Sequence, residues 1–179
     1  SAYSDTKPHY ELLNGLRGIA ALMVVLYHIF EGFATSPIDQ RFNHGYLAVD
    51  FFFILSGFVI GYAYDDRWQK MKTKDFIKRR LIRLHPMIVL GLVFGVITFL
   101  IQGGKQWDGT SVSVSMVILA LLLSLFLIPA IPGSGVEVRG NGEMFPLNGP
   151  IWTLFFEYIG NILYALILRR LSNKMLTIL

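Results

Sequence analysis

The stretch NGLRGIAALMVVLYH at residues 14–28 is almost wholly apolar, yet it carries an arginine near its start and a histidine at its end. Arg17 and His28 are eleven positions apart, and eleven steps of about 100° bring a helix back to within about 20° of the starting direction. A helix here places both side chains on one face, about 16 Å apart along the axis. Because an ionisable residue is costly inside a membrane helix, this pair is a candidate functional site.

The composition extends the membrane interpretation to the whole chain. Of its 179 residues, 54% are hydrophobic and 16% are charged, whereas soluble domains average about 25% charged residues. The apolar segments predict five spans, at about residues 12–33, 46–64, 84–101, 112–131 and 151–168. The predicted fold class is therefore all-α, a multi-pass transmembrane helix bundle. The absence of cysteine excludes disulfides and thiolate chemistry.

Basic residues concentrate between the second and third predicted spans, namely Lys70, Lys72, Lys74, Lys78, Arg79, Arg80 and Arg83. Such a cluster is typical of a cytoplasmic loop beside anionic lipid; a site for a polyanionic ligand is the alternative. No nucleic-acid-binding module accompanies it, which disfavours DNA or RNA as a partner. Apolar residues recur at helical spacing in residues 73–84 and predict an amphipathic helix, capped by Thr73 and leading into the third span, with a kink at Pro86.

The predicted topology conflicts with the charge pattern at one point. If the basic loop is cytoplasmic, five spans leave Arg169 and Arg170 on the outer side, against the positive-inside rule. Either one segment is re-entrant or broken, or these two arginines are an exception.

Several polar residues are candidate partners of His28. Glu31 follows it at i+3 and can orient the imidazole, or is a solvated residue at the membrane edge. Asp50 opens the second span, where the helix dipole favours an acid; it can also hold the His28 tautomer. Ser56 and Gly57 lie mid-span, where small residues allow close helix packing or leave room for a ligand.

The fifth predicted span carries a polar stripe at i, i+4, i+8 and i+11, formed by Thr153, Glu157, Asn161 and Tyr164. Glu157 is the costliest of these to bury and needs protonation, an arginine partner or a wet cavity. An ion pair with Arg17 is the structural interpretation. Trp152, five residues before Glu157, is an interfacial anchor by itself.

If the basic loop is cytoplasmic, Arg17 and the loop arginines converge where a phosphate-bearing cofactor arrives, and guanidinium groups pair bidentately with phosphate.

Four blocks of sequence resemble one known family in order and spacing. They are LNGLRGIAALMVVLYH at residues 13–28, GYLAVDFFFILSGF at 45–58, FIKRRLIRLHP at 76–86 and PIWTLFFE at 150–157. In these blocks the chain resembles the integral-membrane acyltransferase-3 family, bacterial O-acyltransferases of surface polysaccharides and related acceptors.

The resemblance implies a domain of about ten membrane helices in the cell (inner) membrane, of which residues 1–179 are the N-terminal half. It implies acyl-CoA, most simply acetyl-CoA, as the donor from the cytoplasm, and a hydroxyl on an extracytoplasmic glycan or lipid-linked saccharide as the acceptor. The family's motif positions map onto Arg17, His28, Arg79, Arg80, Arg83, Trp152 and Glu157, with Asp50, Ser56 and Gly57 in its second block.

The sequence thus leads to the hypothesis of a membrane O-acyltransferase. His28 activates the acceptor hydroxyl or transiently takes the acyl group, Asp50 or Glu31 orients it, and Glu157 shapes the polar pocket. The arginines hold the CoA phosphates, and no metal is expected, because a thioester is already an activated donor and zinc-ligand clusters are missing. The alternatives are a transporter or flippase subunit that uses Arg17, His28 and Glu157 as a substrate or proton path, and a non-catalytic scaffold.

Overall fold

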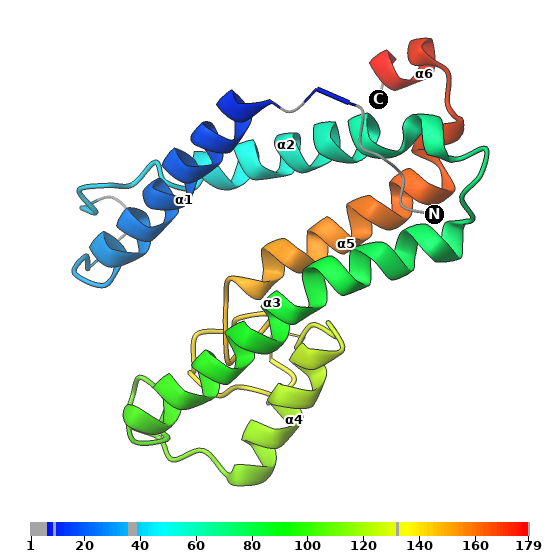
Figure 1. Ribbon diagram of the computed structural model, residues 1–179. Coiled ribbons are helices and arrows are strands. Elements are labelled where there is room, and N and C mark those ends of the chain that lie inside the picture. Colours follow the sequence, from blue (N-terminus) through cyan, green and yellow to red (C-terminus); the bar gives the residue numbers. More distant parts are fainter. Residues whose placement is uncertain (1–6, 9, 36–38, 132, 179) are drawn as a thin grey trace. The chain divides into compact units, whose positions relative to one another are not determined.

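The computed structural model describes residues 7–8, 10–35, 39–131 and 133–178, and in these ranges it contains helices and no strand. The helices are α1 (Glu11–Glu31), α2 (Leu47–Tyr64), α3 (Thr73–Ile101), α4 (Val114–Leu125), α5 (Ile151–Leu166) and α6 (Asn173–Ile178), with the 3-10 turns η1 (Asp65–Arg67) and η2 (Leu168–Arg170) (Figure 1). The chain divides into two compact units, the first ending at Tyr62 and the second beginning at Ala63.

Four segments are long and apolar enough to cross a membrane: Glu11–Glu31, Leu47–Arg67, Thr73–Ile101 and Ile151–Arg170. They match the first, second, third and fifth predicted spans. The predicted fold class, an all-α multi-pass bundle, is confirmed. The predicted amphipathic helix and the third span form one continuous helix, α3, and Pro86 lies inside it. Its N-cap is Lys72 rather than Thr73, and the Asp75 carboxylate accepts a hydrogen bond from the Lys72 backbone N–H at 3.3 Å.

The fourth predicted span, residues 112–131, is wrong as a full span. Only the 12 residues of α4 are helical there, and 12 residues rise about 18 Å, well short of a hydrocarbon core about 30 Å thick. The helix stops because Leu127 adopts a left-handed conformation, with φ of 55°, and Pro129 follows. The apolar residues pack against the rest of the second unit instead: Ala120 is fully buried in its core.

Helices α3 and α5 pack side by side and antiparallel in the second unit (Figure 1). Phe76, near the start of α3, contacts Tyr164, near the end of α5, with ring centroids 5.7 Å apart. The side chain of Asn148, just before α5, donates to the carbonyl of Gly91 in the second half of α3, at 2.8 Å. Buried positions of α3 recur every three or four residues, at Phe76, Arg80, Leu84, Ile88, Leu92, Gly95 and Phe99.

The apolar core of the second unit lies around the C-terminal half of α3. It is formed by Ile88, Leu92, Phe99, Ala120, Val138, Phe145, Leu147 and Ile151. A Cβ on Gly95 would lie 2.4 Å from the backbone oxygen of Leu147, so the absence of a side chain lets the segment before α5 approach α3 closely. The core thus fixes residues 136–150 onto the end of α3.

The first unit contains α1 and most of α2. Ala20 is the one buried residue of α1 in the described structure. In the connection after α1, the Gln40 amide donates to the Tyr27 carbonyl at 2.8 Å, and Gly45 lies against Tyr27, leaving no room for a Cβ. The connection between α1 and α2 is therefore anchored to the end of α1; its residues 36–38 lie outside the described ranges.

Candidate functional site

Arg80 and Glu157 form a buried ion pair between α3 and α5. Nη2 of Arg80 donates to Oε1 of Glu157 at 2.6 Å, and the exposed fractions of the two side chains are 2% and 22%. Arg80 is therefore a partner of Glu157, the role that the sequence left open for Arg17. One turn further along α5, Asn161 donates to the Glu157 carbonyl at 2.8 Å.

Three buried polar atoms around this pair have no hydrogen-bond partner in the described part of the chain. They are Nε of Arg80, the hydroxyl of Tyr158 and Oδ1 of Asn161. Buried polar atoms are costly to leave unpaired. Of the polar stripe predicted on the fifth span, Glu157 meets Arg80 of α3, and Tyr164 lies against Phe76 of the same helix.

Arg79, Arg80 and Arg83 were predicted to act together, but they lie on different faces of α3. Arg79 and Arg83 are exposed and lie one turn apart on α3, whereas Arg80 belongs to the buried positions of that helix. Lys74 and Lys78 are exposed as well. The outward cationic surface of α3 therefore consists of Arg79 and Arg83 with neighbouring lysines, without Arg80.

The end of α5 lies beside the beginning of α3. Trp68 donates from Nε1 to the Tyr164 hydroxyl at 3.1 Å, and the Arg169 guanidinium lies 4.0 Å from the centroid of the Trp68 indole. Arg169 and Arg170 are thus at the same end of the α3–α5 pair as the basic cluster. With α4 too short to count as a span, this arrangement removes the conflict with the positive-inside rule.

In the first unit, Arg17 and His28 lie on the uninterrupted helix α1, Arg17 half-buried and His28 exposed. His28 Nδ1 is 2.9 Å from Glu31 Oε2, and the exposed fractions of the two side chains are 49% and 54%. An ionised carboxylate only accepts hydrogen bonds, so Nδ1 is the donor. In the neutral imidazole, Nε2 then carries the lone pair that a general base uses.

The remaining predicted site residues lie on α2 and α5. Asp50 lies in the first turn of α2, as predicted, and is exposed; within the described ranges its carboxylate makes no hydrogen bond or ion pair. Ser56 is half-buried. No described atom lies within 4 Å of a Cβ built on Gly57, which leaves open space there. Trp152 is exposed in the first turn of α5 and meets Phe156 edge-on, at 6.0 Å between centroids.

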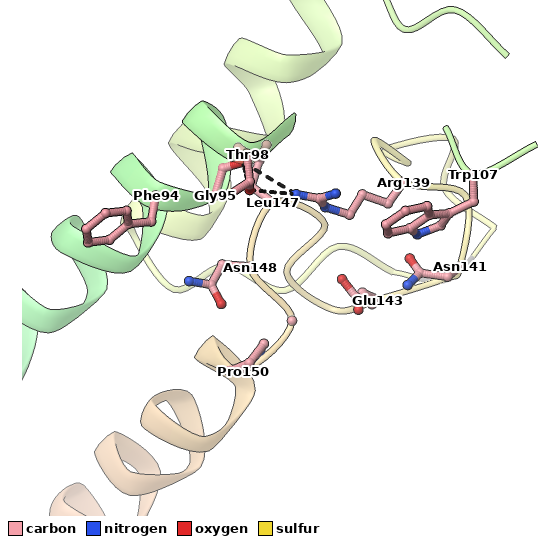
Figure 2. Close-up of a pocket in the computed structure, with 11 residues that line it drawn as sticks. Phe94, Gly95, Thr98, Trp107, Arg139, Asn141, Glu143, Leu147, Asn148 and Pro150 are labelled. Atoms are coloured by element: carbon pink, nitrogen blue, oxygen red, sulfur yellow. Dashed lines mark hydrogen bonds between the residues drawn. The ribbon is translucent and has the colours of Figure 1, made fainter. Parts of the chain in front are cut away.

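A pocket of about 320 Å³ lies at the opposite end of the second unit from the basic cluster (Figure 2). It was not predicted from the sequence. Its walls come from the last turns of α3, the loop after α3 and the segment that leads into α5, and they include Phe94, Thr98, Trp107, Arg139, Asn141, Glu143, Asn148 and Pro150.

Arg139 joins two walls of this pocket. Its Nη2 donates to Thr98 Oγ1 at 3.1 Å, and its Nη1 donates to the Gln102 side chain. The guanidinium lies 5.5 Å from the centroid of the Trp107 ring. A cation beside the last turns of a helix also interacts favourably with the helix dipole. Arg139 therefore fixes the loop to the end of α3 and leaves an open, polar concavity beside it.

Comparison with known proteins supports one family. Residues 10–179 match the acyltransferase domain of the acyltransferase-3 type. This chain belongs to the acyltransferase-3 family. The family resemblance read from the four sequence blocks is confirmed, and the protein is assigned to the acyltransferases as an enzyme class.

Three relatives illustrate how much of each protein the chain covers. It is 34% identical over 167 residues to "Protein 2 in picA locus" of Rhizobium radiobacter, covering 86% of this chain and 80% of that protein. It is 37% identical over 158 residues to the acyltransferase MdmB of Streptomyces mycarofaciens, covering 82% of this chain and 36% of that protein. A Staphylococcus aureus (strain COL) protein named "Putative O-acetyltransferase" is 40% identical over 95 residues, 50% of this chain and 14% of that protein. No solved structure gives a significant match.

Proposed function

We propose that this chain is the N-terminal part of a multi-pass O-acyltransferase of the cell (inner) membrane. It moves an acyl group, most simply acetyl, from cytoplasmic acyl-CoA to a hydroxyl of an extracytoplasmic glycan or lipid-linked saccharide. The chain belongs to an acyltransferase family, and the two ends of the α3–α5 pair in its second unit differ in a way that supports this proposal. The basic cluster between the second and third predicted spans lies at one end of the pair, together with Arg169 and Arg170. An open polar pocket lies at the other end.

In this proposal the basic end receives the donor. Exposed guanidinium groups at Arg79 and Arg83, one turn apart on α3, pair with the phosphates of CoA. Arg17, on α1, stays a sequence-based candidate for the same role. Trp152, in the first turn of α5, is at the other end of the helix pair and is a candidate contact only for the acyl end of the donor. Ser56 and Gly57, on α2, stay sequence-based candidates for donor binding. Arg80 acts through Glu157 as a positioning residue, because its guanidinium is already engaged by that carboxylate.

His28 is the proposed base. Glu31 holds the Nδ1–H, and Nε2 removes the proton from the acceptor hydroxyl. The hydroxyl oxygen attacks the thioester carbonyl, the C–S bond breaks, and the CoA thiolate takes up the proton that His28 has received. In the alternative with a covalent step, Nε2 attacks the thioester carbonyl first, and the C–S bond breaks to release the CoA thiolate. The acceptor hydroxyl oxygen then attacks the acyl carbon, the bond from this carbon to Nε2 breaks, and the hydroxyl proton passes to the thiolate. Asp50 is the second candidate to orient the imidazole, and Glu157 holds Arg80 between α3 and α5.

The decisive experiment uses the full-length protein in liposomes, with labelled acetyl-CoA on the side of the basic cluster and a glycan acceptor on the other. The enzyme proposal expects label on the acceptor, with free CoA released in equal amount. Transport of acceptor or donor across the bilayer without any transfer of label would support the alternative, a transporter or flippase subunit in which Arg17, His28 and Glu157 form the path.

A further inference from the structure

The pocket at the end of α3 that is remote from the basic cluster has the chemistry of a binding site. Figure 2 shows the Asn148 amide and the Glu143 carboxylate on opposite walls, with Asn141 and Trp107 beyond the carboxylate. Asn141, Glu143 and Asn148 come from the segment that leads into α5, and Trp107 comes from the loop after α3. The volume of about 320 Å³ is at the lower end of the range of about 300–1,000 Å³ for small-molecule sites, which fits one ring-sized group.

The charges of the pocket narrow the class of ligand. The Arg139 guanidinium is bound to the Thr98 and Gln102 side chains and lies over the Trp107 ring, so it acts as a support of the wall. A second cation beside the same ring would be repelled by it. Arg139 and Glu143 bring one charge of each sign to the lining, which favours a neutral ligand over an ion. Carboxylate and amide oxygens together accept hydrogen bonds from a neutral ligand that carries several hydroxyl groups.

Gly149 sets the position of the carboxylate. A Cβ on Gly149 would lie 2.7 Å from Oε1 of Glu143, so the carboxylate packs directly against the glycine backbone. This contact fixes one wall of the pocket, and a methyl group at residue 149 would displace the Glu143 side chain. An indole such as Trp107 offers an apolar face with a polar edge, which suits the mixed surface of a sugar ring.

From this arrangement we propose that the pocket binds one neutral, polyhydroxylated ring of the acceptor, a single pyranose unit. Glu143 accepts hydrogen bonds from the hydroxyl groups of this ring, and Trp107 lies against its apolar face. The inference rests on the proposed function and deepens it, since it gives the acceptor a binding site at the end of α3 that is opposite to the donor cations. It makes Glu143, Trp107 and Asn148 the residues that select the acceptor.

The test measures binding of methyl glycosides to the full-length protein in detergent, without acyl-CoA, by saturation-transfer NMR. The methyl glycosides of glucose, galactose, mannose and rhamnose serve as probes. Glu143→Gln and Trp107→Ala should each weaken binding of the preferred glycoside by about tenfold, the size expected when one charge-assisted hydrogen bond or one stacking contact is lost. Gly149→Ala should weaken it in the same direction.

The matched controls are Glu137→Gln, a carboxylate of the same loop outside the pocket, and Phe126→Ala, an exposed aromatic outside the pocket. Both should bind the glycoside with unchanged affinity, and thermal unfolding checks that every variant folds. The proposal is overturned if none of the four glycosides binds, if both pocket variants bind them normally, or if tetramethylammonium binds the pocket in their place.

Acyl transfer gives a separate readout. If transfer occurs but the acceptor KM is the same in Glu143→Gln, Trp107→Ala and the unsubstituted protein, the pocket is not the acceptor site and the proposed function stands. If glycoside binding depends on the pocket but no label is ever transferred, the sugar site stands and the proposed function is lost.

Discussion

Two pairs of a carboxylate with a nitrogen base contrast in this chain. Glu31 meets His28 three residues away on α1, and about half of each side chain is exposed. Glu157 meets Arg80 across a sequence separation of 77 residues, and the arginine is almost fully buried. The first pair is local and open to a substrate. The second joins two helices and is closed to one.

The contrast indicates different roles for similar chemistry. An exposed pair contributes little to stability, about 0–1 kcal/mol, so the interest of His28 and Glu31 lies in their reactivity. Removing one partner of a buried pair leaves an uncompensated charge and costs about 3–5 kcal/mol. The difference in burial therefore distinguishes His28, the proposed base, from Arg80, the proposed positioning residue. The following variants test this distinction.

The largest effect is expected from His28→Ala. Loss of a general base typically lowers kcat by about 10²–10⁴-fold, and an exposed side chain on α1 should leave the unfolding temperature unchanged. Steady-state transfer of labelled acetyl groups measures the first quantity, and thermal unfolding in detergent measures the second. His44→Ala, an exposed histidine after α1, is the control and should retain activity. A variant that unfolds early but transfers normally per folded molecule would favour the scaffold alternative.

Arg80→Ala should lower the free energy of unfolding by about 3–5 kcal/mol, because it leaves Glu157 buried without its cation. The double variant Arg80→Met with Glu157→Leu should recover most of that loss, since an apolar pair of similar volume can replace a buried ion pair. Denaturant unfolding of the full-length protein measures both. Arg79→Ala is the stability control and should unfold as the unsubstituted protein does. Normal stability of Arg80→Ala, together with weaker donor binding, would return Arg80 to the CoA site.

The paired substitution Arg79→Ala with Arg83→Ala should raise the KM for acyl-CoA by about tenfold at low salt, because two exposed phosphate contacts are lost. Raising the ionic strength should shrink the difference, since salt screens exposed charges. Lys105→Ala, a cation in the loop after α3, should leave this KM unchanged. If the KM for acyl-CoA is the same with and without the two arginines, they serve only to orient α3 in the membrane.

The smallest effect is expected from Glu31→Gln. The exposed hydrogen bond to His28 Nδ1 is worth about 0–1 kcal/mol, so kcat should fall by less than about fivefold while the KM for the acceptor stays the same. Glu11→Gln, an acid at the other end of α1, is the matched control. A loss as large as that of His28→Ala would mean that the carboxylate takes part in the chemistry directly.

The sequence predicted the membrane helices well and their contacts poorly. Long apolar segments predicted α1, α2 and α5 within a few residues, and the end of α3 at Ile101, because such segments have few alternatives. The first turns of α3 were predicted as a separate amphipathic helix. The same criterion failed for residues 112–131, because an apolar segment that packs on a neighbouring helix has the same composition as a membrane span. The polar stripe of the fifth span was predicted, but its partner depends on tertiary packing that no local pattern shows.

One missed feature was present in the sequence. Phe76, Arg80 and Leu84 follow one another at intervals of four, the spacing of a single helix face, and this places Arg80 with the buried side chains and apart from Arg79 and Arg83. The pocket had no such signal. Trp107, Arg139 and Glu143 lie in irregular segments without periodicity, and only the packing of residues 136–150 onto α3 brings them together.

The long sequence separation of the buried ion pair has a consequence for biosynthesis. At about 5–20 residues per second, the ribosome needs roughly 4–15 s to reach Glu157 after it has made Arg80. During that interval α3 enters the membrane with an unneutralised guanidinium, which costs about 2.5–3.5 kcal/mol if it sits at the centre of a helix. Arg80 is in the second turn of α3, where a long side chain can still reach the headgroups, and we expect α5 to supply on its arrival the carboxylate that pairs with it.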